Sequence, residues 1–224
     1  MLKSIRVALW GLVLVTVAVV SGVYVGQTFF SDGRNALGTS GLGAALARSQ
    51  YEEAGGPFTL IGLDGRTVTR DDLKGKPLAL FFGFTHCPDV CPTAMLEASN
   101  WLDALGDDAD KLTVAFVSVD PARDTPELLK HYLGAFDTRI VGLTADDEAT
   151  IAKVAERYKV RFEKVPLANG SYTMNHTADT LLFDADGNYV DFIAYLAPNI
   201  RANETVFEAE NTRTLEKLRA LIAS

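Results

Sequence analysis

Apolar residues follow strand and helix patterns from about residue 57 to the end of the chain. The unbroken apolar run at 78–84 predicts a fully buried strand, and the segment 112–119 predicts a second one. A short strand is expected at 140–141. Apolar positions at helical spacing predict four helices, at 92–105, 125–136, 146–158 and 203–222.

Two turn sequences predict β-hairpins at the two ends of this region. Asp64-Gly65 separates the strand-forming segments 58–61 and 67–69, and Asp186-Gly187 separates 180–183 from 189–194. Strands that alternate with helices and end in a hairpin and a helix indicate an α/β fold. We therefore predict a central mixed β-sheet flanked by helices.

The N-terminal residues predict a membrane anchor. Residues 7–25 carry no charge and follow Lys3 and Arg6, and this run is longer than the apolar core of about 7–15 residues in a signal peptide. We therefore favour a single transmembrane helix in residues 1–26 over a cleaved signal peptide. The positive charges are expected to stay cytoplasmic, which in a bacterium places the following chain on the periplasmic side of the inner membrane.

Residues 27–55 are rich in Gly, Ala and Ser and have no sustained periodicity, so we interpret them as a linker to a folded domain at 56–224. The formal net charge of -8 argues against nucleic acid as a partner, because phosphate binding requires a basic surface. The two cysteines can form at most one disulfide.

Cys87 and Cys91 lie where the predicted buried strand leads into a helix, and Pro92 suits the first turn of that helix. Unpaired backbone N–H groups and the helix dipole stabilise a thiolate at such a position. The pair could form a disulfide or bind one soft metal ion. A thioredoxin-type redox pair has two intervening residues, whereas this pair has three.

The chain offers three histidines as a further ligand. His86 is adjacent to Cys87 and is expected to serve local packing or to support a ligand from behind, and His131 lies on a predicted solvated helix. His176 lies in a polar turn just before the strand at 180–183, where a loop can present a ligand from a rigid scaffold. A closed zinc site would need four ligands, whereas two thiolates and one imidazole suit copper, as Cu(I) or Cu(II).

Three stretches resemble the Sco/SenC proteins of cytochrome c oxidase assembly, namely residues 82–92, 117–126 and 172–177. The resemblance covers residues 56 to the C-terminus. It implies a thioredoxin-like fold that binds copper through Cys87, Cys91 and His176. One departure is Asn175, where the family usually has aspartate before the histidine. Within the second stretch, we interpret Asp120 as a turn residue and Asp124 as a carboxylate at a helix N-terminus.

The resemblance implies a copper metallochaperone for the binuclear copper site of cytochrome c oxidase. Its expected partners are the copper-site subunit of the oxidase, other copper chaperones and thiol oxidoreductases. An enzyme remains open as an alternative, a thiol-disulfide oxidoreductase that keeps partner cysteines reduced through Cys87 and Cys91. A peroxidase of the peroxiredoxin type and a redox or copper sensor are further alternatives. His176 separates the first two functions, because thiol exchange requires no imidazole.

Overall fold

The computed structural model describes residues 48–224. The predicted anchor at 1–26 and most of the predicted linker at 27–55 therefore lie outside the described residues. A compact unit begins at Gln50, six residues before the expected start of the domain, and Tyr51 and Ala54 are buried in its core. No helix within 48–224 is long and apolar enough to cross a membrane.

A seven-stranded mixed sheet forms the centre of this unit, in the order β2-β1-β5-β4-β3-β8-β9. Strands β3, β4 and β5 run parallel, whereas β1, β8 and β9 each run antiparallel to the neighbour nearer the centre. Both predicted hairpins form, as β1 with β2 and β8 with β9. The strand bounds are β1 Thr59–Gly62, β2 Thr67–Thr69, β3 Leu78–Gly83, β4 Thr113–Ser118, β5 Val141–Thr144, β8 Thr180–Phe183 and β9 Tyr189–Ile193.

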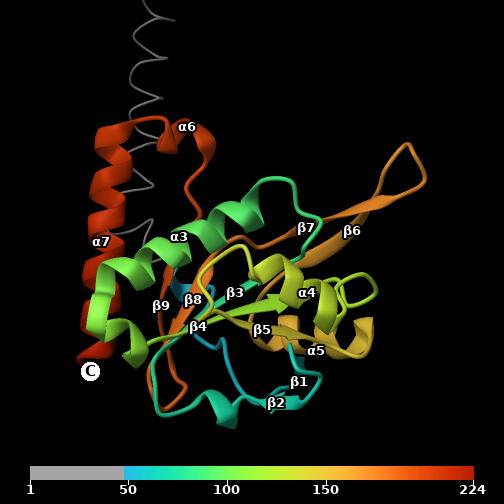
Figure 1. The fold of residues 1–224 in the computed structure, drawn as a ribbon, viewed down its shortest axis with the longest axis horizontal. Coiled ribbons are helices and arrows are strands. Elements are labelled where there is room, and N and C mark those ends of the chain that lie inside the picture. Colours follow the sequence, from blue (N-terminus) through green and yellow to red (C-terminus); the bar gives the residue numbers. More distant parts are fainter. Residues whose placement is uncertain (1–47) are drawn as a thin grey trace, which may run out of the picture. The chain divides into compact units, whose positions relative to one another are not determined.

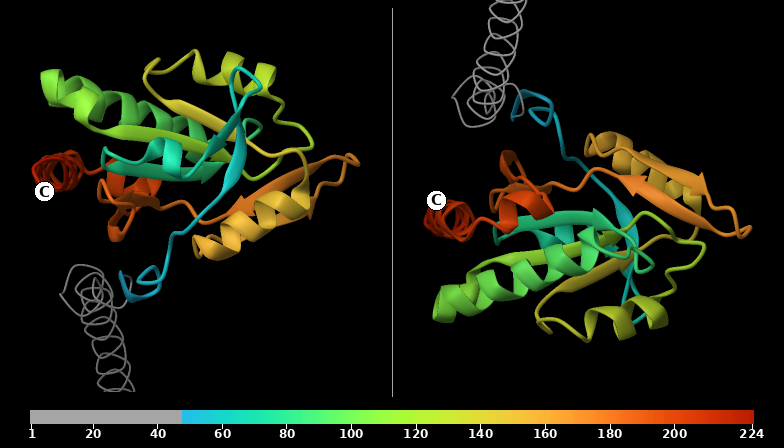
Figure 2. Two further views of the ribbon diagram at one scale, coloured as in Figure 1. Left: turned by 90° about the horizontal axis from the view of Figure 1, so that it is seen from below. Right: turned by 90° about the horizontal axis from the view of Figure 1, so that it is seen from above.

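Helices cover both faces of the sheet, as the apolar run in β3 requires, because all six residues of that strand are buried. Figure 2 shows α3 (Val90–Leu105) and α4 (Pro126–Leu133) on one face and α5 (Glu148–Arg157) on the other. The last helix, α7 (Glu204–Ile222), lies beside α3 (Figure 1), and Arg219 donates a hydrogen bond to the carbonyl of Ala104 there. The predicted α/β fold with a central mixed sheet is confirmed.

The first helix after the cysteines begins earlier than predicted. Helix α3 starts at Val90, and the amide of Thr93 donates to the carbonyl of Asp89. Pro92 still lies in the first turn, where its missing N–H would have no intrahelical partner. Cys91 is therefore inside the helix, as its second residue.

A second, two-stranded sheet was not predicted. Strands β6 (Phe162–Pro166) and β7 (Tyr172–His176) pair antiparallel and project from the body as a hairpin (Figure 1). The segment around His176 is thus a strand, where we expected a polar turn. Most side chains of the hairpin are partly or fully exposed, so no apolar run marks it in the sequence. Three short helices were also missed, η1 (Asp71–Leu73), η2 (Gly106–Lys111) and α6 (Pro198–Arg201).

Candidate metal centre

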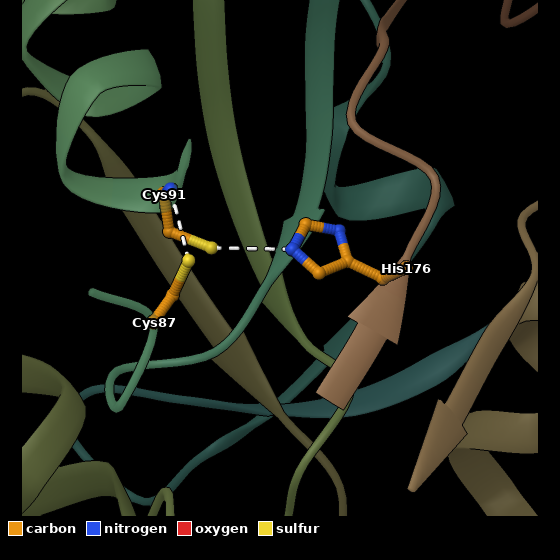
Figure 3. A group of neighbouring side chains, drawn as sticks. All are labelled: Cys87, Cys91 and His176. Atoms are coloured by element: carbon orange, nitrogen blue, oxygen red, sulfur yellow. Dashed lines mark hydrogen bonds between the residues drawn. The ribbon is translucent and has the colours of Figure 1, made fainter. Parts of the chain in front are cut away.

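Three predicted residues meet at one point of the structure (Figure 3). Cys87 lies in the loop after β3, Cys91 in the first turn of α3, and His176 at the end of β7. The Nε2 atom of His176 lies 3.4 Å from the Sγ atom of Cys91, and all three ligand atoms lie within 4.8 Å of one another. Within residues 48–224, this is the only such group of three or more His, Cys, Asp or Glu side chains.

The two thiols have different environments. Both are free, but Cys87 is partly exposed and Cys91 is fully buried. A hydrogen bond from the Cys91 thiol is the largest cause that lowers the pKa of Cys87 to about 4, and the Cys91 amide, 3.3 Å from Sγ, adds to it. Burial is the main cause that raises the pKa of the Cys91 thiol. The hydrogen bond between Cys91 and Cys87 and the negative charge of Cys87 raise it further. In the metal-free protein the pair therefore carries one thiolate, on Cys87.

The imidazole of His176 is fixed in the form that a metal ligand needs. Its Nδ1 atom lies 2.8 Å from the carbonyl oxygen of Thr177. A carbonyl can only accept a hydrogen bond, so Nδ1 carries the proton and the lone pair of Nε2 faces the thiols. The rings of Phe81 and Phe84 meet the imidazole edge to face, at centroid distances of 5.9 and 5.7 Å.

The inner wall of the site is closely packed. A Cβ atom added at Gly83 would lie 2.9 Å from the Sγ atom of Cys91 and 2.9 Å from the ring of Phe116. Real Cβ atoms do not approach other atoms so closely, so the last residue of β3 must be glycine for α3 to place Cys91 against the strand.

The outer side of the site is open. A pocket of about 260 Å³ is lined by Cys87, His176, Asp89 and Asn175, with the buried Met174 at its wall. This opening leaves room for a further ligand from solvent or from another protein.

The other two histidines lie apart from the ligand group. His86 is exposed, and its Nδ1 lies 3.0 Å from the hydroxyl oxygen of Thr85. His131 is exposed on α4. Both line a separate hollow with Tyr132.

The interpretation of Asp124 as a helix N-terminal carboxylate was wrong. The N-cap of α4 is Thr125, whose side chain accepts from the amide of Leu128. Asp124 is fully buried and turns inward, where it accepts hydrogen bonds from the amide of Thr85 at 3.0 Å, the hydroxyl of Thr85 at 2.6 Å and the hydroxyl of Ser118 at 2.6 Å. It thus holds the loop that carries Cys87.

Two further residues near the site were not singled out from the sequence, Arg123 and Tyr172. Asp120 is buried and accepts from the hydroxyl of Tyr172 at 2.9 Å and from Nε of Arg123 at 2.5 Å. Arg123 also donates to the carbonyl of Tyr172 at 2.9 Å. The only sequence signal for both was their place inside the stretches that carry the family resemblance.

The donor set fits copper on chemical grounds. Thiolates favour soft ions such as Cu(I), and imidazole is acceptable to both copper oxidation states. A structural zinc site would be closed by a fourth ligand. The described part of the chain brings three ligand side chains together and leaves the fourth direction open.

Comparison with known proteins gives consistent matches. A protein-family model described as SCO1/SenC matches residues 47–209. Protein SCO2 of Saccharomyces cerevisiae mitochondria is 40% identical over 140 residues, which are 61% of this chain and 46% of that protein. The chain thus spans about half the length of this relative. Protein SenC of Rhodobacter capsulatus is 33% identical over 176 residues, 79% of this chain and 78% of SenC.

Solved structures share the fold. The copper-bound structure of Bradyrhizobium japonicum ScoI superposes with a TM-score of 0.61 at 48% identity. The match covers 69% of this chain and 98% of that one. The thioredoxin-like fold implied by the resemblance agrees with this match.

Proposed function

The chain belongs to the SCO1/SenC family, and on this premise we propose that it is a copper metallochaperone that binds copper through Cys87, Cys91 and His176. The observation that carries the proposal is the convergence of two thiols and one oriented imidazole from separate elements. The similar ScoI is described with copper bound, which supports copper as the ion.

Copper is cargo in this proposal. Cys87 is already a thiolate, the Cys91 thiol loses its proton as the ion binds, and Nε2 of His176 completes a three-ligand site. The open side of the site lets a ligand of the receiving protein enter and exchange for one of the three. Oxidation of the pair by a partner disulfide, which takes up two electrons, forms a Cys87–Cys91 disulfide, releases the one thiol proton of the pair and ends binding, because a disulfide is a poor ligand for copper.

The proposed receiver is the copper-site subunit of cytochrome c oxidase, and the family resemblance supports it. Other copper chaperones or thiol oxidoreductases would load or reduce the site. In this proposal residues 1–26 anchor the protein in the bacterial inner membrane, and the domain faces the periplasm. The acidic net charge supports protein partners and not nucleic acid.

A thiol-disulfide oxidoreductase is the second candidate, and the difference between the two thiols favours it. The Cys87 thiolate would attack a partner disulfide, form a mixed disulfide and release one partner thiolate. The Cys91 thiol would then attack Cys87, lose its proton and release the second partner thiolate. The reaction leaves a Cys87–Cys91 disulfide and a reduced partner.

Copper titration of the reduced full-length chain, beside the His176→Ala variant, separates the two candidates. Cu(I) is followed by competition with a chromogenic chelator, and Cu(II) by its thiolate charge-transfer absorption. A metallochaperone gives one-to-one binding that weakens by a factor of about ten or more without His176. Exposed His131→Ala is the matched control and should bind as the wild type. Weak binding that is indifferent to His176 would favour thiol exchange.

A further inference from the structure

The metal centre is assembled from two parts of the chain that need a common support. The cysteines follow β3, whereas His176 lies 85 residues after Cys91 on the β6–β7 hairpin. This hairpin forms its own two-stranded sheet and shares no ladder with the seven-stranded sheet. Apart from its short covalent link to β8 through residues 177–179, side-chain contacts hold its position relative to the cysteines.

The loop of residues 119–125, between β4 and α4, contacts both parts. On one side, Asp124 accepts two hydrogen bonds from Thr85, which lies two residues before Cys87. Because Asp124 is fully buried, these bonds are shielded from water and hold the start of the cysteine loop firmly.

On its other side, the same loop holds Tyr172, four residues before His176 on β7. Asp120 accepts from the tyrosine hydroxyl, and Arg123 donates to the tyrosine carbonyl. The guanidinium of Arg123 also lies 3.8 Å from the centroid of the Tyr172 ring and 6.0 Å from that of Phe84, which packs edge to face with His176.

The loop itself is held by internal hydrogen bonds. The amides of Arg123 and Asp124 both donate to the carbonyl of Asp120. The hydroxyl of Ser118 accepts from the amide of Asp120 and donates to the carboxylate of Asp124, and Thr144 donates to the carbonyl of Asp124. The two contacts are therefore parts of one rigid unit.

We propose that the loop of residues 119–125 positions the metal ligands, with Asp124 holding the cysteine loop and Asp120 with Arg123 holding the hairpin that carries His176. Its effect on copper rests on the proposed function. These residues touch no metal themselves. They set the distance between Nε2 of His176 and the two sulfurs.

The test compares Arg123→Leu with the wild type in the reduced, full-length chain titrated with copper. Loss of the hairpin contact should weaken copper binding about tenfold, which is the usual effect of removing a residue that orients a metal ligand. It should also shift the Cu(II) charge-transfer spectrum toward that of His176→Ala. The alkylation rate of Cys87 in the metal-free protein should not change. Tyr172→Phe removes only the hydroxyl contact and should shift the spectrum in the same direction by a smaller amount.

Glu148→Gln is the matched control. It breaks a different contact of the hairpin, the ion pair between Lys164 and Glu148 at 2.6 Å, which is exposed at both ends. This variant should keep the wild-type spectrum and affinity. Wild-type spectra for both Arg123→Leu and Tyr172→Phe would overturn the proposal, and so would an equal shift in Glu148→Gln.

A measurement without metal separates this proposal from the function proposed above. Hydrogen exchange of the amides in 162–176 should be faster in Arg123→Leu than in the wild type, and unchanged in Glu148→Gln. If the wild type binds no copper, the function fails, but the exchange result still decides the role of the loop. Equal exchange in Arg123→Leu and the wild type would overturn it.

Discussion

The two cysteines of the metal centre differ in exposure and in acidity, and this difference sets their reactivity. Cys87 is partly exposed with a lowered pKa, whereas Cys91 is buried with a raised one. A thiolate is the nucleophilic form of cysteine. Any reagent or partner that reacts with the metal-free pair should therefore react first at Cys87.

Alkylation of the metal-free, reduced protein measures this difference. With a folded-state pKa of about 4, Cys87 is already a thiolate at pH 6, so its rate should stay constant from about pH 6 to 8 and fall only as the pH drops through 4. Cys91→Ala removes the hydrogen bond that is the largest cause of the lowered pKa, so the Cys87 rate at pH 6 should fall. Peptide mapping by mass spectrometry identifies the modified thiol. A wild-type midpoint near pH 8.5 would contradict this account.

Asn175 is the residue at which the chain departs from the family pattern. It is exposed and lines the same opening as Cys87 and His176. In Asn175→Asp the added negative charge should favour Cu(II) over Cu(I), because two thiolates leave a Cu(II) site neutral and a Cu(I) site negative. We expect Cu(II) affinity to rise about fivefold, corresponding to about 1 kcal/mol for a partly exposed charge pair. Separate titrations of the variant and the wild type with Cu(II) and with Cu(I) test this. An equal change in the affinity for both ions would contradict it.

Among the elements, β3 and α3 depend on each other through Gly83. Gly83→Ala should lower the free energy of unfolding by about 1–3 kcal/mol through overpacking and also weaken copper binding, since Cys91 must move. Thermal unfolding and copper titration measure the two effects. Gly65→Ala is the control. Gly65 lies in an exposed turn with a positive φ of 76°, and a Cβ atom added there would have no neighbour within 4 Å. The variant should therefore lose stability through its backbone conformation and keep its copper affinity. Unchanged copper binding in Gly83→Ala would contradict this role of the glycine.

The sequence predicted the elements that have a strong periodic signal and missed those that do not. Strand β3 is apolar throughout, so its place in the sheet and the position of the cysteines after it were predictable. The β6–β7 hairpin has short, mostly exposed strands, and it forms through local pairing that leaves no apolar run. For this reason the sequence identified His176 as a ligand candidate but did not predict that it lies on a strand.

The contacts of Asp124 and Arg123 were out of reach for a different reason. Their partners lie 39 residues earlier, at Thr85, and 49 residues later, at Tyr172. A carboxylate before a helix is commonly a cap, and only the tertiary fold shows that this one turns inward. Long-range hydrogen bonds of this kind follow from how β4 lies between β3 and β5, which a local pattern does not encode.

At the scale of the whole molecule, the proposed function assigns membrane anchoring and copper binding to separate parts of the chain. The compact unit begins at Gln50 and contains all three proposed ligands. Deletion of residues 1–26 should therefore move the protein from the membrane fraction to the soluble fraction and leave copper affinity within about twofold of the full chain. Fractionation of cells and copper titration test the two halves. Loss of copper binding on deletion would contradict the separation.

The most direct test of the central claim is X-ray absorption at the copper edge of the reduced, full-length chain loaded with one equivalent of Cu(I). We expect two sulfur ligands and one imidazole nitrogen in the wild type, and loss of the nitrogen signal alone in His176→Ala. His131→Ala should give the wild-type spectrum. A wild-type site with two sulfurs and no nitrogen, unchanged in His176→Ala, would contradict the claim that the hairpin histidine completes a copper site.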